Sequence, residues 1–227
     1  MVVPARDEEE LLPGCLDSMA RAVEQLDMRH PGVHCTVTVV LDGCTDRSAD
    51  AVGHRPWESA LEADVRRVGA ARAIGVLEAE QRLGQHDPAG VWVANTDADT
   101  RVPPHWLTEQ VRLAALGHGL VVGTVRPDPA DLTEAELARW QAGHRLVEGH
   151  RHVHGANLGF SLAAYRRVGG FPPVTAHEDV ALVAAMRAAG VPWCATTRTE
   201  VTTSGRRWSR VEDGFARRLR TLASTPE

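Results

Sequence analysis

The 227-residue chain lacks the features that mark membrane, secreted and nucleic-acid-binding proteins. It has no run of about 18 consecutive apolar residues, so we expect no transmembrane helix. Arg6 and Asp7 bring charge too early for a signal peptide. A net charge of −5 argues against nucleic acid as a partner, because such partners usually require a basic face. The four cysteines form no CxxC pair, so we expect reduced thiols in a cytoplasmic protein.

The most informative stretch is an apolar run that leads into two carboxylates. Residues 91–94 predict a buried strand, and Asp97 and Asp99 follow it. A turn there can bring both carboxylates to one point, where they repel each other unless a cation lies between them. Paired oxygen ligands suit Mg²⁺ or Mn²⁺. The alternative is a polar turn, since Asn and Asp are common turn residues.

Strand and helix patterns alternate along the chain. Strands are predicted at 2–3, 35–41, 64–68, 91–94 and 120–125. Helices are predicted at 8–26, 46–52, 69–83, 103–116, 132–144 and 180–189. The alternation predicts an α/β fold, with a mostly parallel, Rossmann-like central sheet flanked by helices.

Polar residues follow the first four predicted strands. In chain order they are Arg6, Asp7, Asp42, Arg72, Asp97 and Asp99. The carboxyl ends of parallel strands meet at one edge of a sheet, where open α/β sheets bind their ligands. We therefore expect these side chains to share one crevice.

Five segments, taken in order, resemble the family 2 glycosyltransferases, which have the GT-A fold. They are VVPARDEE from Val2, VLDGCTD from Val40, GAARAIG from Gly69, TDAD from Thr96 and HED from His177. The resemblance implies a single GT-A domain, with a nucleotide-binding half at 1–100 and an acceptor-binding half at 101–227. Leu41 departs from the pattern, because members more often have an acidic residue there. The C-terminal loop at residues 204–208 lacks the glutamine of polymer-forming members, and this implies a non-processive enzyme.

The resemblance also implies a donor site. Contacts to the nucleotide sugar are expected from Pro4, Arg6, Asp7, Asp42, Arg72, Asp97, Arg206, Arg207 and Trp208. Asp42 would accept a hydrogen bond from a base N–H, most naturally that of uracil, and its alternative role is to cap a turn. Asp99 and Asp97 would coordinate Mg²⁺ or Mn²⁺. The stretch from Arg206 to Trp208 would be a mobile loop that closes on the diphosphate, or else a solvated basic patch.

The acidic pair Glu178 and Asp179 precedes a predicted helix, where acidic residues are common for electrostatic reasons. The resemblance implies that Asp179 is the general base and that Glu178 supports it, with the order of the two open. It implies substrate contacts for His154, Gly155, Asn157 and His177. The alternating histidines at 150, 152 and 154 would share one face of a strand, either as an edge strand or as a metal site.

These observations predict a hexosyltransferase that moves a sugar from a nucleoside diphosphate, expected to be UDP, to an acceptor hydroxyl. The expected mechanism is metal-dependent inverting displacement. A retaining transferase, a sugar nucleotidyltransferase and a nucleotide-sugar binding module without activity stay open. The sequence does not identify the acceptor, and a small molecule, a lipid carrier and a glycan all stay open. A homodimer is compatible with the sequence.

Overall fold

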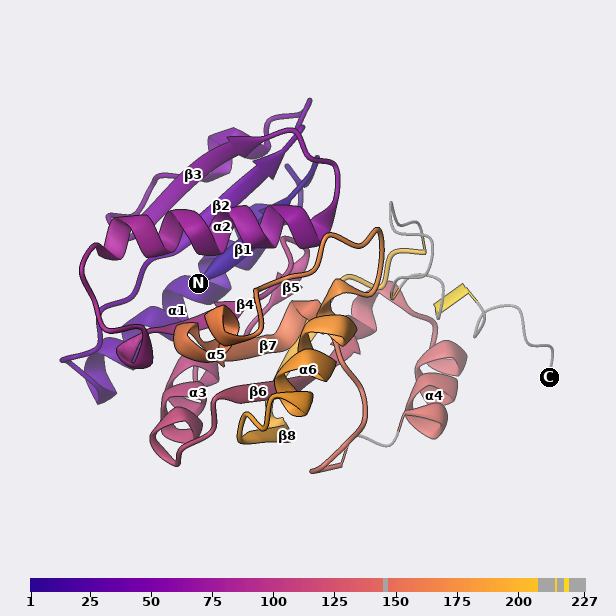
Figure 1. The fold of residues 1–227 in the computed structure, drawn as a ribbon. Coiled ribbons are helices and arrows are strands. Elements are labelled where there is room, and N and C mark those ends of the chain that lie inside the picture. The colour runs from indigo at the N-terminus through magenta and orange to yellow at the C-terminus, as the bar shows by residue number, and fades with distance from the viewer. Residues whose placement is uncertain (145–146, 208–214, 216–218, 221–227) are drawn as a thin grey trace.

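A computed structural model describes residues 1–144, 147–207, 215, 219 and 220 of the chain (Figure 1). An eight-stranded sheet forms its centre, with the strand order β3-β2-β1-β4-β7-β6-β8-β5. Helices flank this sheet, so the predicted α/β fold is confirmed (Figure 1). Within the described residues, no helix combines the length and the apolar character needed to cross a membrane.

The first half of the sheet is parallel. Its strands are β1 (Val2–Ala5), β2 (Val37–Asp42), β3 (Glu58–Ala63) and β4 (Trp92–Asn95). β1 lies between β2 and β4, and β3 pairs with the outer side of β2. β2 is rich in β-branched residues and is buried along its whole length, which suits the interior of a sheet. The carboxyl ends of β1, β2 and β4 therefore meet at one edge.

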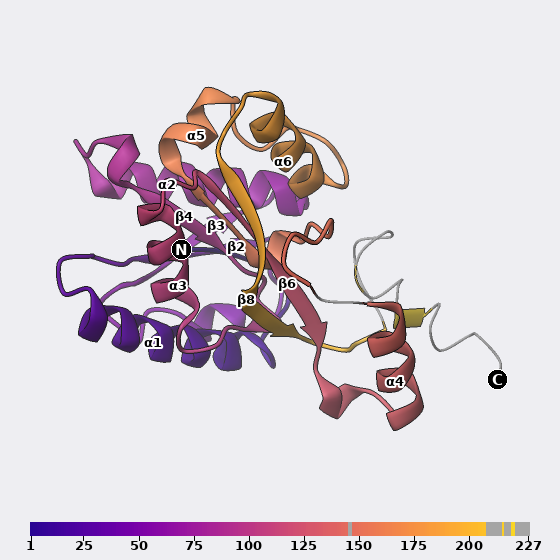
Figure 2. The same cartoon turned by 90° about the horizontal axis from the view of Figure 1, so that it is seen from below.

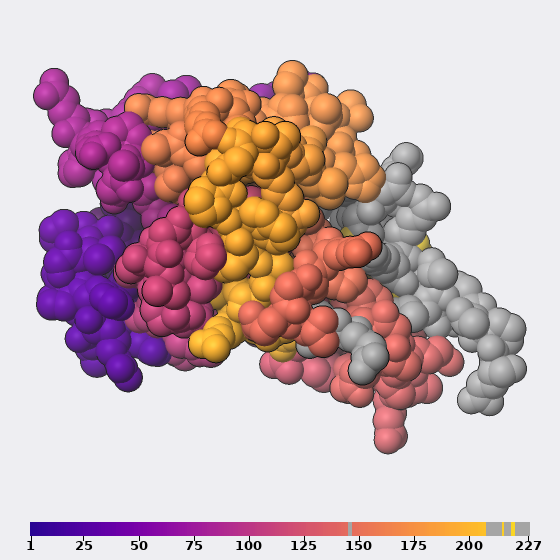
Figure 3. Space-filling model, turned by 60° about the horizontal axis from the view of Figure 1, so that its bottom comes forward, coloured from indigo at the N-terminus to yellow at the C-terminus, as the bar shows by residue number. Residues whose placement is uncertain are grey.

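The second half of the sheet mixes strand directions. Its strands are β5 (Thr100–Arg101), β6 (Leu120–Pro127), β7 (Leu158–Ser161) and β8 (Trp193–Thr203). β7 runs antiparallel to β4 and β6, whereas β8 runs parallel to β6. Figure 3 shows the gold chain of β8 at the surface beside the magenta α3 region. Thr203 at the end of β8 pairs with Thr100, so β8 ends directly beside Asp99.

Helices cover both faces of the sheet (Figure 2). One face carries α1 (Leu12–Arg29) and α3 (Trp106–Ala115), and the other carries α2 (Val68–Leu83), α5 (Leu162–Arg167) and α6 (Glu178–Ala188). Alternation along β1 explains the two layers, because Val3 packs in the core under α1 while Val2 packs in the core under α2 and α6.

Helix α4 (Glu134–Gly143) stands apart from the sheet, at the right of Figure 1. It begins with a capping box. The Thr133 hydroxyl accepts from the Glu136 amide, and the Glu136 carboxylate accepts from the Thr133 amide at 2.9 Å. The segment leading to it contributes Asp128 and Asp131, which bond to the end of β8. The segment that precedes α4 thus packs against the end of β8 and the residues that follow it.

The expected strand at 64–68 is wrong, because β3 is Glu58–Ala63 and α2 begins at Val68. The amides of Val65 and Arg66 donate to the carboxylate of Asp42, and Arg66 has a left-handed φ of +52°, which a strand does not allow. β3 escaped prediction because it is an edge strand of mixed polar and alanine composition.

Other boundaries also differ from expectation. Residues 46–52 form only a 3-10 turn at Ser48–Ala51, and 150–154 form no strand, so the edge-strand expectation is wrong there. α1 and α3 begin later than predicted, at Leu12 and Trp106. The short elements β5, β7 and α5 and the threonine-rich β8 were not predicted, because none carries a strong hydrophobic period.

Candidate active site

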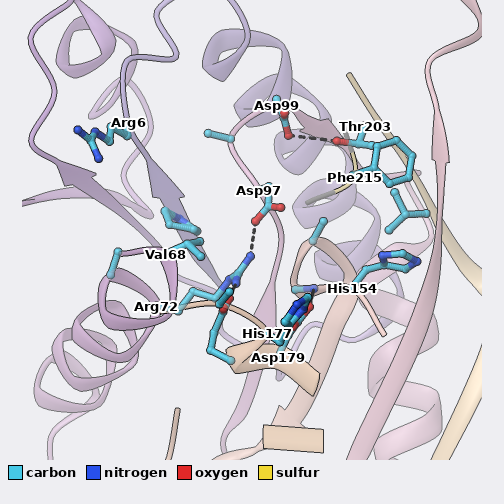
Figure 4. A pocket seen from close by; sticks show the side chains of 18 of the residues that line it. Arg6, Val68, Arg72, Asp97, Asp99, His154, His177, Asp179, Thr203 and Phe215 are labelled. Carbon is cyan, nitrogen blue, oxygen red and sulfur yellow. Dashed lines mark hydrogen bonds and ion pairs between the residues drawn. The ribbon is translucent and has the colours of Figure 1, made fainter. Parts of the chain in front are cut away.

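A crevice with a volume of about 940 Å³ opens where β1, β2 and β4 end (Figure 4). The first turn of α2, the segment before α6 and the end of β8 complete its walls. Twelve predicted site residues line it: Pro4, Arg6, Asp42, Arg72, Asp97, Asp99, His154, Gly155, His177, Glu178, Asp179 and Arg206. The cavity is within the usual size range of small-molecule sites.

Arg72 is the centre of what we call the inner cluster, which also contains Asp97 and Glu178. Its guanidinium donates to Asp97 Oδ1 at 2.5 Å and to the Glu178 carboxylate (Figure 4). The Arg72 side chain is 3% exposed and that of Glu178 is 6% exposed, so these charges need each other. A Cβ at Gly155 would lie 2.4 Å from the guanidinium, and one at Gly69 would lie 2.6 Å from the Glu178 side chain. Both glycines therefore make room for the cluster.

Arg206, Glu8 and Asp99 form what we call the outer cluster. Arg206 pairs with both oxygens of Glu8, at 2.8 and 2.6 Å, and its Nη2 lies 2.9 Å from Asp99 Oδ2. The Thr203 hydroxyl donates to Asp99 Oδ1 at 3.1 Å (Figure 4). Burial and the charge of Asp97 raise the pKa of Asp99 to about 6, against the opposing effect of Arg206. The protein thus holds Asp99 where added positive charge stabilises it.

Asp179 lies in the crevice near His177 and His154 (Figure 4). Its Oδ2 accepts from the Gly155 amide at 2.7 Å, and its Oδ1 accepts from the Val180 amide at 2.8 Å. An ionised carboxylate has about four lone-pair sites, so these two bonds fix it and leave further acceptor capacity. Neighbouring helical residues point about 100° apart, so Asp179 reaches Gly155 while the residue before it reaches the inner cluster.

Asp42 is buried at the end of β2, at 4% exposed. Its Oδ1 accepts from the Val65 and Arg66 amides at 2.7 and 2.8 Å. This bond pair holds the turn before α2, whereas the alternative role expected from the sequence was to cap the local turn before Gly43. Pro4 and Arg6 line the same end of the crevice, and a contact from Asp42 to a nucleobase stays a prediction.

Asp7 does not line the crevice. Its Oδ1 accepts from the amide and hydroxyl of Thr45, at 2.7 and 3.2 Å. Among the described residues, Asp7, Cys44 and Asp46 have ligand atoms within 4.8 Å of one another, so they could hold a metal ion. This partly exposed group is distinct from the predicted pair of metal ligands.

Asn157 does not line the crevice and is 2% exposed. Its Nδ2 donates to the carbonyls of Thr124 and Thr199 at 2.8 and 2.6 Å, and its Oδ1 accepts from Trp106 Nε1 at 2.9 Å. A Cβ at Gly123 would lie 2.2 Å from the same amide. These bonds direct the Asn157 amide into the core and away from the crevice.

The predicted C-terminal loop, from Arg206 to Trp208, does not act as one unit at the crevice, because only Arg206 of its described residues lines it. Arg207 pairs with Glu136 of α4 at 2.5 Å and does not line the crevice. Trp208 lies outside the described residues. Up to Arg206 the segment is held in place, because the Gly205 amide donates to Asp131 Oδ2 at 2.7 Å. The structure thus brings Arg206 to the crevice and takes Arg207 away from it.

Sequence reasoning missed several residues of the crevice. Glu8 is buried in it at 7% exposed, although its sequence position suggested only the start of a helix. Thr203, Arg151 and Phe215 also line it. A carboxylate directly after Arg6 and Asp7 was the available signal for Glu8. Thr203 carried no such signal, because it reaches the crevice through its strand pairing with Thr100, which a single sequence does not reveal.

Three histidine rings contact that of His152, with interplanar angles of 16–29°. The centroid of His152 lies 5.8 Å from those of His144 and His150 and 6.2 Å from that of His154. Within the part of the chain that the structure describes, they form no group of three metal ligands. His152 and His154 line the crevice, with His154 near Asp179 (Figure 4).

Asp97 and Asp99 fit a divalent cation by the chemistry of their donor atoms. They offer only carboxylate oxygens, the ligands that Mg²⁺ and Mn²⁺ prefer. They are close enough for the charge of Asp97 to raise the pKa of Asp99, and an arginine is paired with each of them. A bound cation would relieve the same repulsion.

Comparison with known proteins gives a family match. The model of the family described as "Glycosyl transferase family 2" matches residues 1–168. The undecaprenyl-phosphate 4-deoxy-4-formamido-L-arabinose transferase of Serratia proteamaculans is 30% identical over 171 residues, and that of Aeromonas hydrophila is 28% identical over 175. Each alignment covers 74% of this chain and 48% of the relative, so the chain spans about half the length of these relatives.

Solved structures share the fold at low identity. A mannosyltransferase from Pyrobaculum calidifontis in complex with GDP-Man and Mn²⁺ superposes with a TM-score of 0.63 at 22% identity, over 94% of this chain and 57% of that one. The protein GalNAc-T7 with UDP, GalNAc and Mn²⁺ superposes with a TM-score of 0.64 at 11% identity, over 90% of this chain and 43% of that one. The fold is therefore GT-A-like.

Proposed function

Since this chain belongs to glycosyl transferase family 2, we propose that it moves a sugar from a nucleoside diphosphate, with UDP expected, to an acceptor hydroxyl. The observation that carries the proposal is the meeting of Asp97, Asp99 and Asp179 in one crevice. Residues 1–100 would bind the donor and 101–227 the acceptor. A hexose donor and a cytoplasmic location stay predictions, and the named relatives transfer an L-arabinose derivative.

The donor diphosphate would lie over the aspartate pair. Asp97 and Asp99 would hold Mg²⁺ or Mn²⁺, whose charge stabilises the departing nucleoside diphosphate. The presence of Mn²⁺ in two structures of similar fold supports this choice of ion. The base would lie toward Pro4, Arg6 and Asp42, which line the end of the crevice under β1 and β2.

The sugar would be transferred by direct displacement. The acceptor oxygen forms a bond to the anomeric carbon, the bond from that carbon to the diphosphate oxygen breaks, and the hydroxyl proton passes to Asp179. Asp179 suits this role because two backbone amides fix it while it still opens to the crevice. Glu178 is engaged by Arg72, so it would position the site and not accept the proton.

A phosphate on a lipid carrier is the second candidate acceptor. The named relatives are undecaprenyl-phosphate sugar transferases, and Arg151, His152, His154 and His177 line this crevice together with Asp179. Arginine and histidine side chains can donate to phosphate oxygens. A phosphate monoester has a second pKa of about 6, so at neutral pH its oxygen has no proton for a base to remove.

Asp179→Asn separates the two candidates. For a hydroxyl acceptor it should lower transfer about 10²–10⁴-fold, the usual contribution of a general base, and leave metal and nucleotide binding intact. For a phosphate acceptor the loss should be far smaller. The assay follows release of the nucleoside diphosphate with simple alcohols, sugars and a short-chain polyprenyl phosphate as acceptors, and Glu178→Gln serves as the comparison.

The remaining interpretations have distinct readouts. Retention of the anomeric configuration in the product would favour a retaining transferase. Release of pyrophosphate from a nucleoside triphosphate would favour a nucleotidyltransferase. Nucleotide binding with neither transfer nor hydrolysis would favour a binding module. A larger loss of transfer in Glu178→Gln than in Asp179→Asn would assign the general base to Glu178 and the supporting role to Asp179.

A further inference from the structure

The outer cluster places an arginine on the carboxylate that is expected to bind the metal. Arg206 Nη2 lies 2.6 Å from Glu8 Oε1 and 2.9 Å from Asp99 Oδ2. One guanidinium thus joins a carboxylate from the start of the chain to one of the proposed metal ligands. Charge-assisted bonds of this kind are among the stronger hydrogen bonds in proteins.

Hydrogen bonds hold both Asp99 and the backbone that carries Arg206, so the Arg206 side chain is the part of the outer cluster expected to move. The Thr203 hydroxyl donates to Asp99 Oδ1, and the Ser204 amide donates to the Asp99 carbonyl at 3.0 Å. The Gly205 amide donates to Asp131, and a Cβ at Gly205 would lie 2.6 Å from the Asp131 Cβ. The backbone thus keeps its place, whereas the Arg206 side chain is 34% exposed at the crevice.

We infer that Arg206 is an internal counter-cation of the metal site, held ready by Glu8, and that a divalent cation must displace it from Asp99. This inference rests on the proposed function. When the donor binds, its diphosphate offers Arg206 a new anionic partner, so release of Asp99 costs less. Metal and nucleoside diphosphate would then bind cooperatively through the exchange of Arg206, in addition to their direct contact.

Glu8 gains a role from this inference that no motif assigned to it. Its carboxylate is 7% exposed, and it contacts Arg206 through both oxygens. It would be a positioning residue, because it keeps the guanidinium at the mouth of the metal site when neither ligand is bound. Arg207 is the natural contrast, because its guanidinium pairs with Glu136 outside the crevice.

The test measures Mn²⁺ alone, by titration with the electron paramagnetic resonance signal of the free ion. Without nucleotide, Arg206→Gln should bind Mn²⁺ about tenfold or more tightly than the wild type, since one charge-assisted bond no longer has to break. Arg207→Gln makes the same change of charge in the same segment and should match the wild type. Mn²⁺ affinity in Arg206→Gln that is equal to or weaker than in the wild type would overturn the inference.

A second measurement covers the case in which Arg206→Gln folds poorly. Arg206→Lys keeps the charge but lacks the planar pair of donors, so its Mn²⁺ affinity should lie between those of wild type and Arg206→Gln. Adding UDP should tighten Mn²⁺ binding by a larger factor in the wild type than in either variant. Equal factors in all three would contradict the exchange, whereas absence of any UDP binding to the wild type would count against the proposed function instead.

Discussion

The inner and outer clusters are built from the same chemistry and differ in how firmly they are held. In the inner cluster, Arg72 is 3% exposed and lies against Gly155, which leaves no space for another arrangement. In the outer cluster, Arg206 is 34% exposed and its side chain borders the crevice. Burial therefore separates an arginine that builds the site from one that is able to move within it.

The difference also divides the acidic residues. Glu178 belongs to the inner cluster and would stay paired when ligands bind, whereas Asp99 belongs to the outer cluster and would exchange its partner. Asp97 contacts Arg72 but is 36% exposed, so it can serve the cluster and a ligand together. Asp97 therefore combines a structural contact with an accessible carboxylate, and the Glu178–Asp179 pair divides the same two roles between its residues.

The largest expected effect on stability comes from removing the inner arginine. Arg72→Met leaves the buried carboxylate of Glu178 unpaired, which should lower the free energy of unfolding by about 3–5 kcal/mol. Urea denaturation measures it. Adding Glu178→Leu to the same variant should recover part of the loss, because the unpaired charge is then gone. A single variant as stable as the wild type would end the distinction between the clusters.

The next effect comes from filling the space beside that arginine. Gly155→Ala puts a methyl group against the guanidinium and should cost about 1–3 kcal/mol of unfolding free energy through overpacking. Gly14→Ala is the matched control, because Gly14 is helical in α1 and a Cβ there meets nothing within 4 Å. That control should be neutral or stabilising by up to about 1 kcal/mol. Equal changes in unfolding free energy for Gly155→Ala and Gly14→Ala would mean that the inner cluster can shift to accommodate a methyl group.

The smallest effect is expected at the outer arginine. Arg206→Gln should cost roughly 1–2 kcal/mol, because the side chain is partly solvated and its bonds are exchanged for bonds to water. Saturating Mn²⁺ should restore most of this loss, which it should not do for Arg72→Met. Thermal unfolding of both variants with and without Mn²⁺ makes the comparison. A loss as large as that of Arg72→Met, unaffected by Mn²⁺, would show that Arg206 is structural.

The sequence predicted the parts of the site that follow strong apolar strands. Asp42 is the last residue of β2 and Asp97 follows the end of β4 by two positions, so their common edge followed from the parallel fold alone. β3 was misplaced because its own residues are mixed in polarity and because a loop held by Asp42 contains Val65. Local pattern therefore sufficed for the central strands and failed for an edge strand.

The pairings between distant residues could not be predicted. Glu8 and Arg206 are 198 positions apart, and they meet because Thr203 pairs with Thr100 at the end of β8. Residue type also did not separate Asn157, whose amide is bonded within the core, from a ligand contact. These facts depend on the register of β8, which no short motif encodes.

The central claim is that Asp97 and Asp99 hold a divalent cation that binds the donor diphosphate. Thermal unfolding of wild type and Asp99→Asn with UDP or GDP, each with and without Mn²⁺, tests it most directly. At 100 times its dissociation constant, a ligand of the native state should add about 2.7 kcal/mol of stability. The account predicts that this gain needs Mn²⁺ in the wild type and is lost in a folded Asp99→Asn. Equal stabilisation without Mn²⁺, or full stabilisation of Asp99→Asn, would contradict it.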